Sequence, residues 1–136
     1  MQWSAGKNAG FSEAEPWLSV PENYRDINVE KETEDEDSIY FFYKKLIMLR
    51  KEKPVISEGT IEFLERENAD VLAYRRNYKD EELIVLNNLT GGKIVLNGKT
   101  EWKTCHRLLG NYEREYEIES DGKIVLNPYE TLVLEK

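Results

Sequence analysis

The residue types best suited to nucleophilic or metal chemistry are scarce in this sequence and lie side by side. Cys105 is the only cysteine and His106 the only histidine among the 136 residues. A catalytic Cys–His pair needs the imidazole within hydrogen-bond reach of the sulfur. Residues 101–109 read as a strand with Trp102, Thr104 and His106 on one face, so Cys105 would point to the other face. We therefore expect both residues to be structural, and they are too few for a usual zinc site.

Acidic residues are abundant, but their arrangement singles out no catalytic pair. Aspartate and glutamate number 27 against 19 lysines and arginines. The glycine-rich phosphate and dinucleotide motifs are absent, as is the G-x-S-x-G nucleophile elbow. The acidic cluster at 30–37 is most simply a solvated loop that leads into a helix N-terminus. The sequence thus predicts no catalytic residue, no metal ligand and no cofactor-binding residue.

Aromatic side chains on the expected strands offer one alternative function. A row of them could stack on sugar rings, as in a carbohydrate-binding module, although core packing and the filling of edge strands are commoner reasons for such residues. The candidates are Tyr74, Tyr78, Trp102, Tyr112 and Tyr116.

Composition excludes several classes of partner. The net charge of −8 disfavours nucleic acid and anionic membranes. No apolar run approaches the roughly 20 residues that span a bilayer, and residues 1–10 lack the pattern of a secretory signal. A lone cysteine fits a reducing compartment. We expect a cytoplasmic protein, large enough for one domain with a real core.

The central element of the chain is a helix expected at 37–54, which joins the segments 1–36 and 55–136. Asp37 or Ser38 can cap its free N–H groups, Lys51 and Lys53 suit the C-terminal end of the helix dipole, and Pro54 ends it.

This helix is apolar on nearly all sides, which is typical of a helix with protein on nearly all sides. We expect one face to be buried, namely that of Ile39, Phe42, Leu46 and Leu49. Phe41 and Met48 lie roughly opposite, and we expect them to be exposed or to contact the N-terminal loop or another copy.

The flanking segments differ in character. Residues 1–36 show no lasting period and read as an irregular loop that is rich in aromatic residues. Residues 55–136 read as a β domain of short strands separated by turn signals. Strands are expected at 59–66, 71–78, 82–88, 93–96, 101–109, 112–118, 123–126 and 131–134. The fold class is therefore mainly β: an antiparallel Greek-key β-sandwich of roughly seven or eight strands, preceded by the loop and one long α-helix.

Several short motifs carry more information than composition. The first 29 residues contain Met1-Gln2-Trp3-Ser4, Asn8-Ala9-Gly10-Phe11, Pro16-Trp17, Asn23-Tyr24 and Ile27-Asn28-Val29. The helix contains Asp37, Ser38, Tyr43, Lys44, Lys45, Leu46, Ile47, Leu49, Arg50, Lys51 and Pro54. These resemble the segment after the last barrel strand, and the last barrel helix, of the alpha-amylase family of glycoside hydrolases (family 13), in its oligo-1,6-glucosidase and alpha-glucosidase branch. Ser4 departs from the commoner Asp. Residues 126–136 are similar to the final strand of the family's C-terminal β domain.

The resemblance implies a non-catalytic C-terminal fragment of an alpha-glucosidase-like enzyme. Such enzymes retain configuration and use two carboxylates about 5 Å apart, which the family carries on earlier barrel strands, upstream of Met1. We expect no activity from this chain alone, no cofactor, and the N-terminal barrel of the parent enzyme as partner. The alternatives are a carbohydrate-binding sandwich, or a structural domain that forms a homodimer through the helix and the N-terminal loop.

Overall fold

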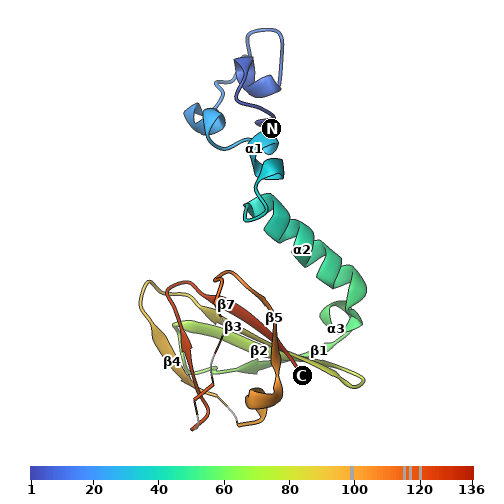
Figure 1. Ribbon diagram of the computed structural model, residues 1–136, viewed down its shortest axis with the longest axis vertical. Coiled ribbons are helices and arrows are strands. Elements are labelled where there is room, and N and C mark those ends of the chain that lie inside the picture. The colour runs from blue at the N-terminus through green and yellow to red at the C-terminus, as the bar shows by residue number, and fades with distance from the viewer. Residues whose placement is uncertain (99, 115, 117, 120) are drawn as a thin grey trace. The chain divides into compact units, whose positions relative to one another are not determined.

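The computed structural model describes residues 1–98, 100–114, 116, 118–119 and 121–136. The chain divides into two compact units, Met1–Glu52 and Lys53–Lys136. Figure 1 shows the first unit in blue to green and the second in green to red.

The N-terminal unit contains more regular structure than the sequence indicates. Turns of 3-10 type cover Lys7–Gly10 and Glu22–Arg25. Helix α1, Val29–Glu34, then includes residues 30–34 of the acidic cluster that we expected to be loop. Its N-terminus forms because the Asn28 side chain accepts a hydrogen bond from the Lys31 N–H at 3.0 Å, the usual capping arrangement.

Helix α2, Ile39–Glu52, confirms the central helix expected at 37–54. Ser38 precedes it, and its Oγ accepts a hydrogen bond from the Phe41 N–H at 3.3 Å. Pro54 does more than end α2, because it occupies the first turn of the short helix α3, Pro54–Ser57. A proline suits that position, where its absent N–H would have no partner.

The expected burial of one α2 face is wrong. No residue of α2 is buried. Ile39 is 71% exposed and Leu46 38% exposed, while Phe42 and Leu49 are half-buried. On the other face Met48 is exposed, as expected, and Phe41 is half-buried. The reason is a shortage of covering material: among residues 1–52, all of which the structure describes, Ala9 is the only buried apolar residue.

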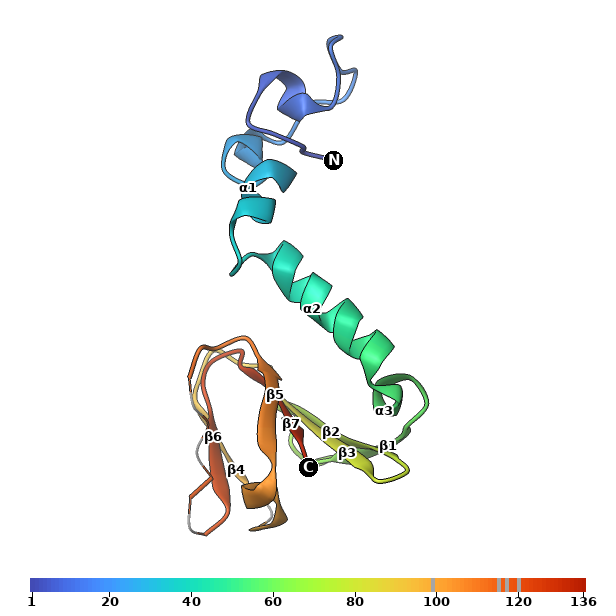
Figure 2. The same cartoon turned by 45° about the vertical axis from the view of Figure 1, so that its right-hand side comes forward.

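The second unit is an antiparallel β-sandwich, as expected (Figures 1 and 2). Its described strands are β1 Thr60–Leu64, β2 Val71–Tyr78, β3 Glu81–Asn88, β4 Ile94–Asn97, β5 His106–Gly110, β6 Lys123–Leu126 and β7 Thr131–Glu135. One sheet has the order β1-β2-β3-β7-β5, and β4 pairs with β6 in the other. After the β1–β2–β3 meander, each connection crosses between the sheets, and β7 returns between β3 and β5. This is the crossing pattern of a Greek key rather than of an up-and-down sheet.

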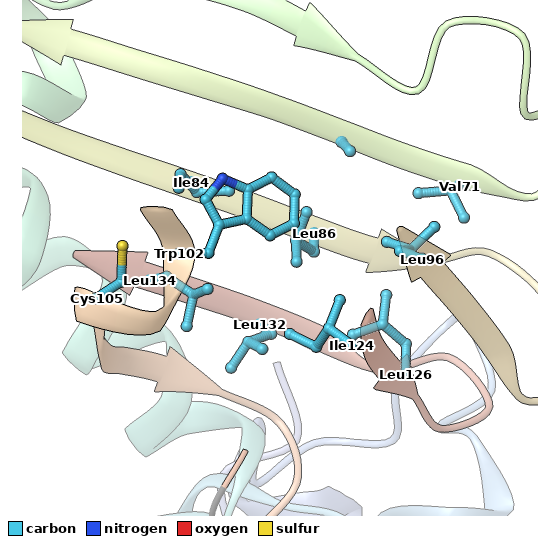
Figure 3. Close-up of a cluster of buried hydrophobic side chains, with 11 residues drawn as sticks. Val71, Ile84, Leu86, Leu96, Trp102, Cys105, Ile124, Leu126, Leu132 and Leu134 are labelled. Carbon is cyan, nitrogen blue, oxygen red and sulfur yellow. The ribbon is translucent and has the colours of Figure 1, made fainter. Parts of the chain in front are cut away.

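A single apolar cluster joins the two sheets (Figure 3). The larger sheet contributes Ile84 and Leu86 from β3 and Leu134 from β7, and β6 contributes Ile124; all four are fully buried. Strand β3 is buried on both faces, from Leu83 to Leu86, as its continuous apolar run predicts.

The strand expected at 101–109 is only half correct. Residues Thr100–Thr104 form a 3-10 helix, and β5 begins at His106. Trp102 is only 2% exposed, and its ring lies so close to Gly98 that a Cβ there would fall 2.8 Å from a ring carbon. Insertion of this ring into the core turns the backbone out of the extended form. Trp102, Thr104 and His106 therefore share no strand face.

The strand expected at 112–118 is not formed by its described residues, which contribute one isolated bridge between Ile118 and Ile124. Positions 115 and 117 lie outside the described residues. The Arg107 guanidinium binds the carbonyls of Tyr112 at 2.6 Å and Arg114 at 2.9 Å. These carbonyls bond to a side chain instead of to a neighbouring strand.

Candidate functional site

The N-terminal unit begins with a strained turn. Asn8, Ala9 and Gly10 all have positive φ, of 52°, 54° and 67°. Left-handed backbone costs roughly 1–2 kcal/mol for a residue other than glycine. The turn is held by the Ala9 carbonyl, which accepts from the N–H groups of Trp3 and Ser4 at 2.8 and 3.1 Å. Strain of this kind is retained where the surrounding structure fixes it, often at functional positions.

Hydrogen bonds tie this turn to α1. The N–H groups of Val29 and Glu30 donate to the carbonyls of Gln2 and Trp3 at 2.9 and 3.0 Å. The Asn28 amide, which is buried, donates to the Tyr24 carbonyl at 2.9 Å. The loop is therefore ordered by polar contacts, with almost no apolar interior.

The apolar side chains of this unit point outward instead. Twelve large ones are exposed: Met1, Trp3, Phe11, Trp17, Leu18, Ile27, Ile39, Tyr40, Tyr43, Leu46, Ile47 and Met48. Trp17 is 92% exposed. We call these residues the apolar surface. Exposure of this many large apolar side chains in one unit is characteristic of an interaction site.

Two hollows lie in the apolar surface. The first, of about 410 Å³, is lined mainly by the loop residues around Phe11 and Trp17 and by the strained Asn8 and Ala9. The second, of about 480 Å³, follows one face of α2. Its lining residues are Ile39, Tyr40, Tyr43, Lys44, Ile47, Met48 and Lys51. We call the second hollow the α2 groove. Both are suited to apolar packing.

Contacts between neighbouring side chains shift the pKa of a few exposed groups. The Tyr24 hydroxyl, which accepts a hydrogen bond from Arg25, raises the pKa of that guanidinium. In the sandwich, a hydrogen bond from Lys123 lowers the pKa of Asp121, and the same contact raises the pKa of Lys123. These shifts arise from neighbouring exposed side chains and not from a reactive site. In the part of the chain that the structure describes, no three His, Cys, Asp or Glu side chains could hold a metal ion.

Cys105 and His106 are separated as the sequence predicts. Cys105 is buried in the core. His106 is exposed, and its Nε2 lies 3.1 Å from Oε2 of Glu135, whose other carboxylate oxygen pairs with Lys53. The contact between His106 and Glu135 links β5 to the end of β7.

Three of the five aromatic residues expected as a possible sugar platform make contacts within the sandwich instead. Trp102 is in the core, Tyr116 donates its hydroxyl to the Cys105 carbonyl, and Tyr74 packs edge-on against Phe63. The sequence reading missed Tyr129, the most exposed large apolar or aromatic side chain of the described sandwich at 65%. Asn127-Pro128-Tyr129-Glu130 is a recognisable turn sequence, but it does not indicate that the tyrosine side chain is exposed.

Comparison with known families assigns both units. Residues 61–133, more than half of the chain, match the maltogenic amylase C-terminal domain. Residues 1–59 match the alpha amylase catalytic domain. The chain belongs to the alpha-amylase family of glycoside hydrolases, family 13, and carries sequence from the end of the catalytic domain and from the C-terminal β domain. Among the described residues, no helix has the length and apolarity needed to cross a membrane.

Within this family, its relatives include alpha-glucosidases. It is 37% identical to the oligo-1,6-glucosidase of Bacillus cereus and 35% identical to the trehalose-6-phosphate hydrolase of Bacillus subtilis (strain 168). Each match covers 98% of this chain and 24% of the relative. The chain thus spans about a quarter of the length of these curated relatives.

Solved structures of such enzymes contain a part with the same fold as this chain. The trehalose-6-phosphate hydrolase of Bacillus licheniformis superimposes with a TM-score of 0.86 at 34% identity, and the trehalulose synthase of Pseudomonas mesoacidophila MX-45 with 0.86 at 30%. Both cover 98% of this chain, and this chain covers 24% of each.

Proposed function

We propose that this chain is the C-terminal part of an alpha-glucosidase-type glycoside hydrolase and contributes structure rather than catalytic groups. The observation that carries the proposal is the apolar surface: a unit ordered by hydrogen bonds, with twelve large apolar side chains left exposed. The part of each relative that this chain does not match makes up about three quarters of the relative's length. A catalytic barrel from that remaining length is the partner that this surface fits.

The carboxylates of the sandwich support a non-catalytic role. A retaining glycosidase needs one carboxylate as nucleophile and another as acid and base, about 5 Å apart and both facing the substrate. The side chain of Glu130 is buried and pairs with Arg114 at 2.8 Å, while Glu135 pairs with Lys53 and His106. These groups hold strands and loops together. In the proposed enzyme, the loop 1–36 forms part of the rim of the active site, and α2 closes the barrel.

A complementation experiment tests the proposal. The Bacillus cereus oligo-1,6-glucosidase is produced without its matched C-terminal quarter and mixed with this chain. Neither part alone should hydrolyse isomaltose, maltose or p-nitrophenyl glucoside, and the mixture should be active. The control supplies the relative's own C-terminal quarter in the same way. If that control restores activity and this chain does not, or if the purified chain is active alone, the proposal is wrong.

Self-association is a second candidate, favoured by the charge pattern along α2. Acidic residues 34–37 precede the helix, and Lys44 and Lys51 line the α2 groove. Antiparallel pairing of two helices would set the acidic start of each copy against the basic half of the other and would cover both grooves. Sedimentation should then show a dimer that weakens as salt is added. A monomer at high protein concentration contradicts this candidate.

We also infer a cytoplasmic location. The support is that the sequence has a single cysteine, which is buried, as is common in a reducing compartment.

A further inference from the structure

The turn at 127–130 has an unexpected residue at its tightest position. Pro128 is second, Tyr129 is third with φ of 53°, and the Glu130 N–H donates to the Asn127 carbonyl at 3.1 Å. A third residue with positive φ is normally glycine or asparagine. For a bulky side chain this backbone is a genuine outlier. Glycine would satisfy the turn without strain, so the turn itself does not explain the tyrosine.

Burial does not explain it either. The Tyr129 side chain is largely exposed. Its ring lies against Gly91, where an added Cβ would sit 3.4 Å from the hydroxyl oxygen and 3.7 and 3.8 Å from two ring carbons. Because Gly91 has no side chain, the Tyr129 ring can pack against the backbone there. The remainder of the ring is exposed to solvent.

Neighbouring segments fix this geometry. The Tyr129 N–H donates to the Thr90 carbonyl at 2.9 Å, and its carbonyl accepts from the Asn111 amide at 2.9 Å. The Tyr112 hydroxyl donates to the Pro128 carbonyl at 2.8 Å, which brings a second, partly exposed ring to the same turn. The strained conformation is therefore held from three sides, and the ring is presented in one defined position.

We propose that the Tyr129 ring is a stacking surface for a glucose unit of an α-linked glucan, outside the active site of the parent enzyme. A pyranose has an apolar C–H face that packs on an aromatic ring and hydroxyls that bond to nearby amides. The Asn111 amide lies at this turn, where it donates to the Tyr129 carbonyl and accepts from the Thr131 N–H at 2.8 Å. A protein partner would need a larger apolar area than this single ring. The choice of a glucan rests on the proposed function, since the relatives are named as glucosidases.

The test uses the full chain and maltoheptaose as the probe, in affinity electrophoresis with soluble starch and in NMR titration. Wild type should be retarded by starch, and its Tyr129 signals should shift with maltoheptaose. Tyr129→Gly should lose at least tenfold in affinity with an unchanged melting temperature, because glycine suits the turn. Tyr129→Phe should retain binding, since the ring face remains. The matched control is Tyr43→Ala, which removes an equally exposed tyrosine from α2 and should bind like wild type.

Two results would overturn the inference: no retardation of the wild type, or equal retardation of wild type and Tyr129→Gly. A separate measurement keeps it distinct from the proposed function. Tyr129→Gly should still complement the truncated oligo-1,6-glucosidase. Loss of complementation in this variant, with no starch binding by the wild type, would assign the ring to a contact with the barrel instead.

Discussion

At the scale of single residues, one carboxylate joins several segments of the sandwich. Glu130 is only 3% exposed. It receives two hydrogen bonds from Arg114, at 3.0 and 2.8 Å, and one from the Asn127 N–H at 2.6 Å. Its own carbonyl accepts from the Asn88 N–H at 2.8 Å. Through these hydrogen bonds, Glu130 and Arg114 connect the β5–β6 loop, the turn before β7 and the end of β3.

We predict that Glu130→Ala lowers the free energy of unfolding of the sandwich by about 3–5 kcal/mol, because it leaves the Arg114 charge and the Asn127 N–H without this partner. Urea denaturation followed by fluorescence measures the loss. Glu113→Ala is the control, since that residue is exposed, and it should change stability by less than about 0.5 kcal/mol. Equal stability of the two variants would contradict the prediction.

Neither Glu130 nor Tyr129 could be chosen from the sequence by residue type. Carboxylates are common along the chain, and burial of one depends on an arginine 16 positions away. The significance of Tyr129 depends on a positive φ and on its proximity to Gly91. Both are long-range or backbone properties that a turn motif alone does not reveal.

At the scale of elements, α2 shows which properties local sequence determines. Its capping serine, its basic C-terminal end and Pro54 are local signals, and they predicted its bounds to within a few residues. Burial of Ile39 and Leu46 is not local, since it requires another surface. The periodicity of apolar residues predicts which face of a helix is apolar. It does not predict whether another part of the protein buries that face.

The α2 groove provides a direct test of this reasoning. Ile47→Glu should leave the helicity of the chain unchanged, because Ile47 is exposed. It should reduce complementation of the truncated oligo-1,6-glucosidase at least tenfold, because burial of an unpaired carboxylate against the barrel is costly. Circular dichroism and isomaltose hydrolysis measure the two effects.

Lys45→Glu introduces the same side chain outside the groove and serves as the control. Equal complementation by the two variants would show that the groove is not the contact.

The region from 100 to 118 shows a different limit of sequence reasoning. Side chains on one face recur every two residues in a strand and every three residues in a 3-10 helix. A segment of only five residues is too short for these two spacings to be told apart. The outcome at Trp102 depends on the absence of a side chain at Gly98 and on the core that receives the indole ring. Strands β3, β6 and β7 were easier to predict from the sequence. Each is a short apolar run that is bounded by turn residues and compatible with burial.

At the scale of the whole molecule, the two units differ in where their stability comes from. Residues 53–136 have their own apolar core, whereas Ala9 is the one apolar residue that residues 1–52 bury. Residues 53–136 produced alone should therefore unfold in a single cooperative transition with a stability of several kcal/mol. Residues 1–52 alone should show no cooperative transition, because isolated helices of this length are marginal in water.

Calorimetry of the two pieces measures this difference. The full chain should show the same transition as residues 53–136 when no barrel is supplied. A cooperative transition in residues 1–52 alone would mean that polar contacts stabilise that unit more than we infer.

The apolar surface also has a consequence for the cell. Chaperones and proteases recognise exposed hydrophobic side chains as the mark of an unfinished protein. A copy whose apolar surface is uncovered therefore displays a quality-control signal even though its sandwich is correctly folded. Binding of a partner would hide that signal, so the abundance of the chain should follow the supply of whatever covers Trp17 and α2.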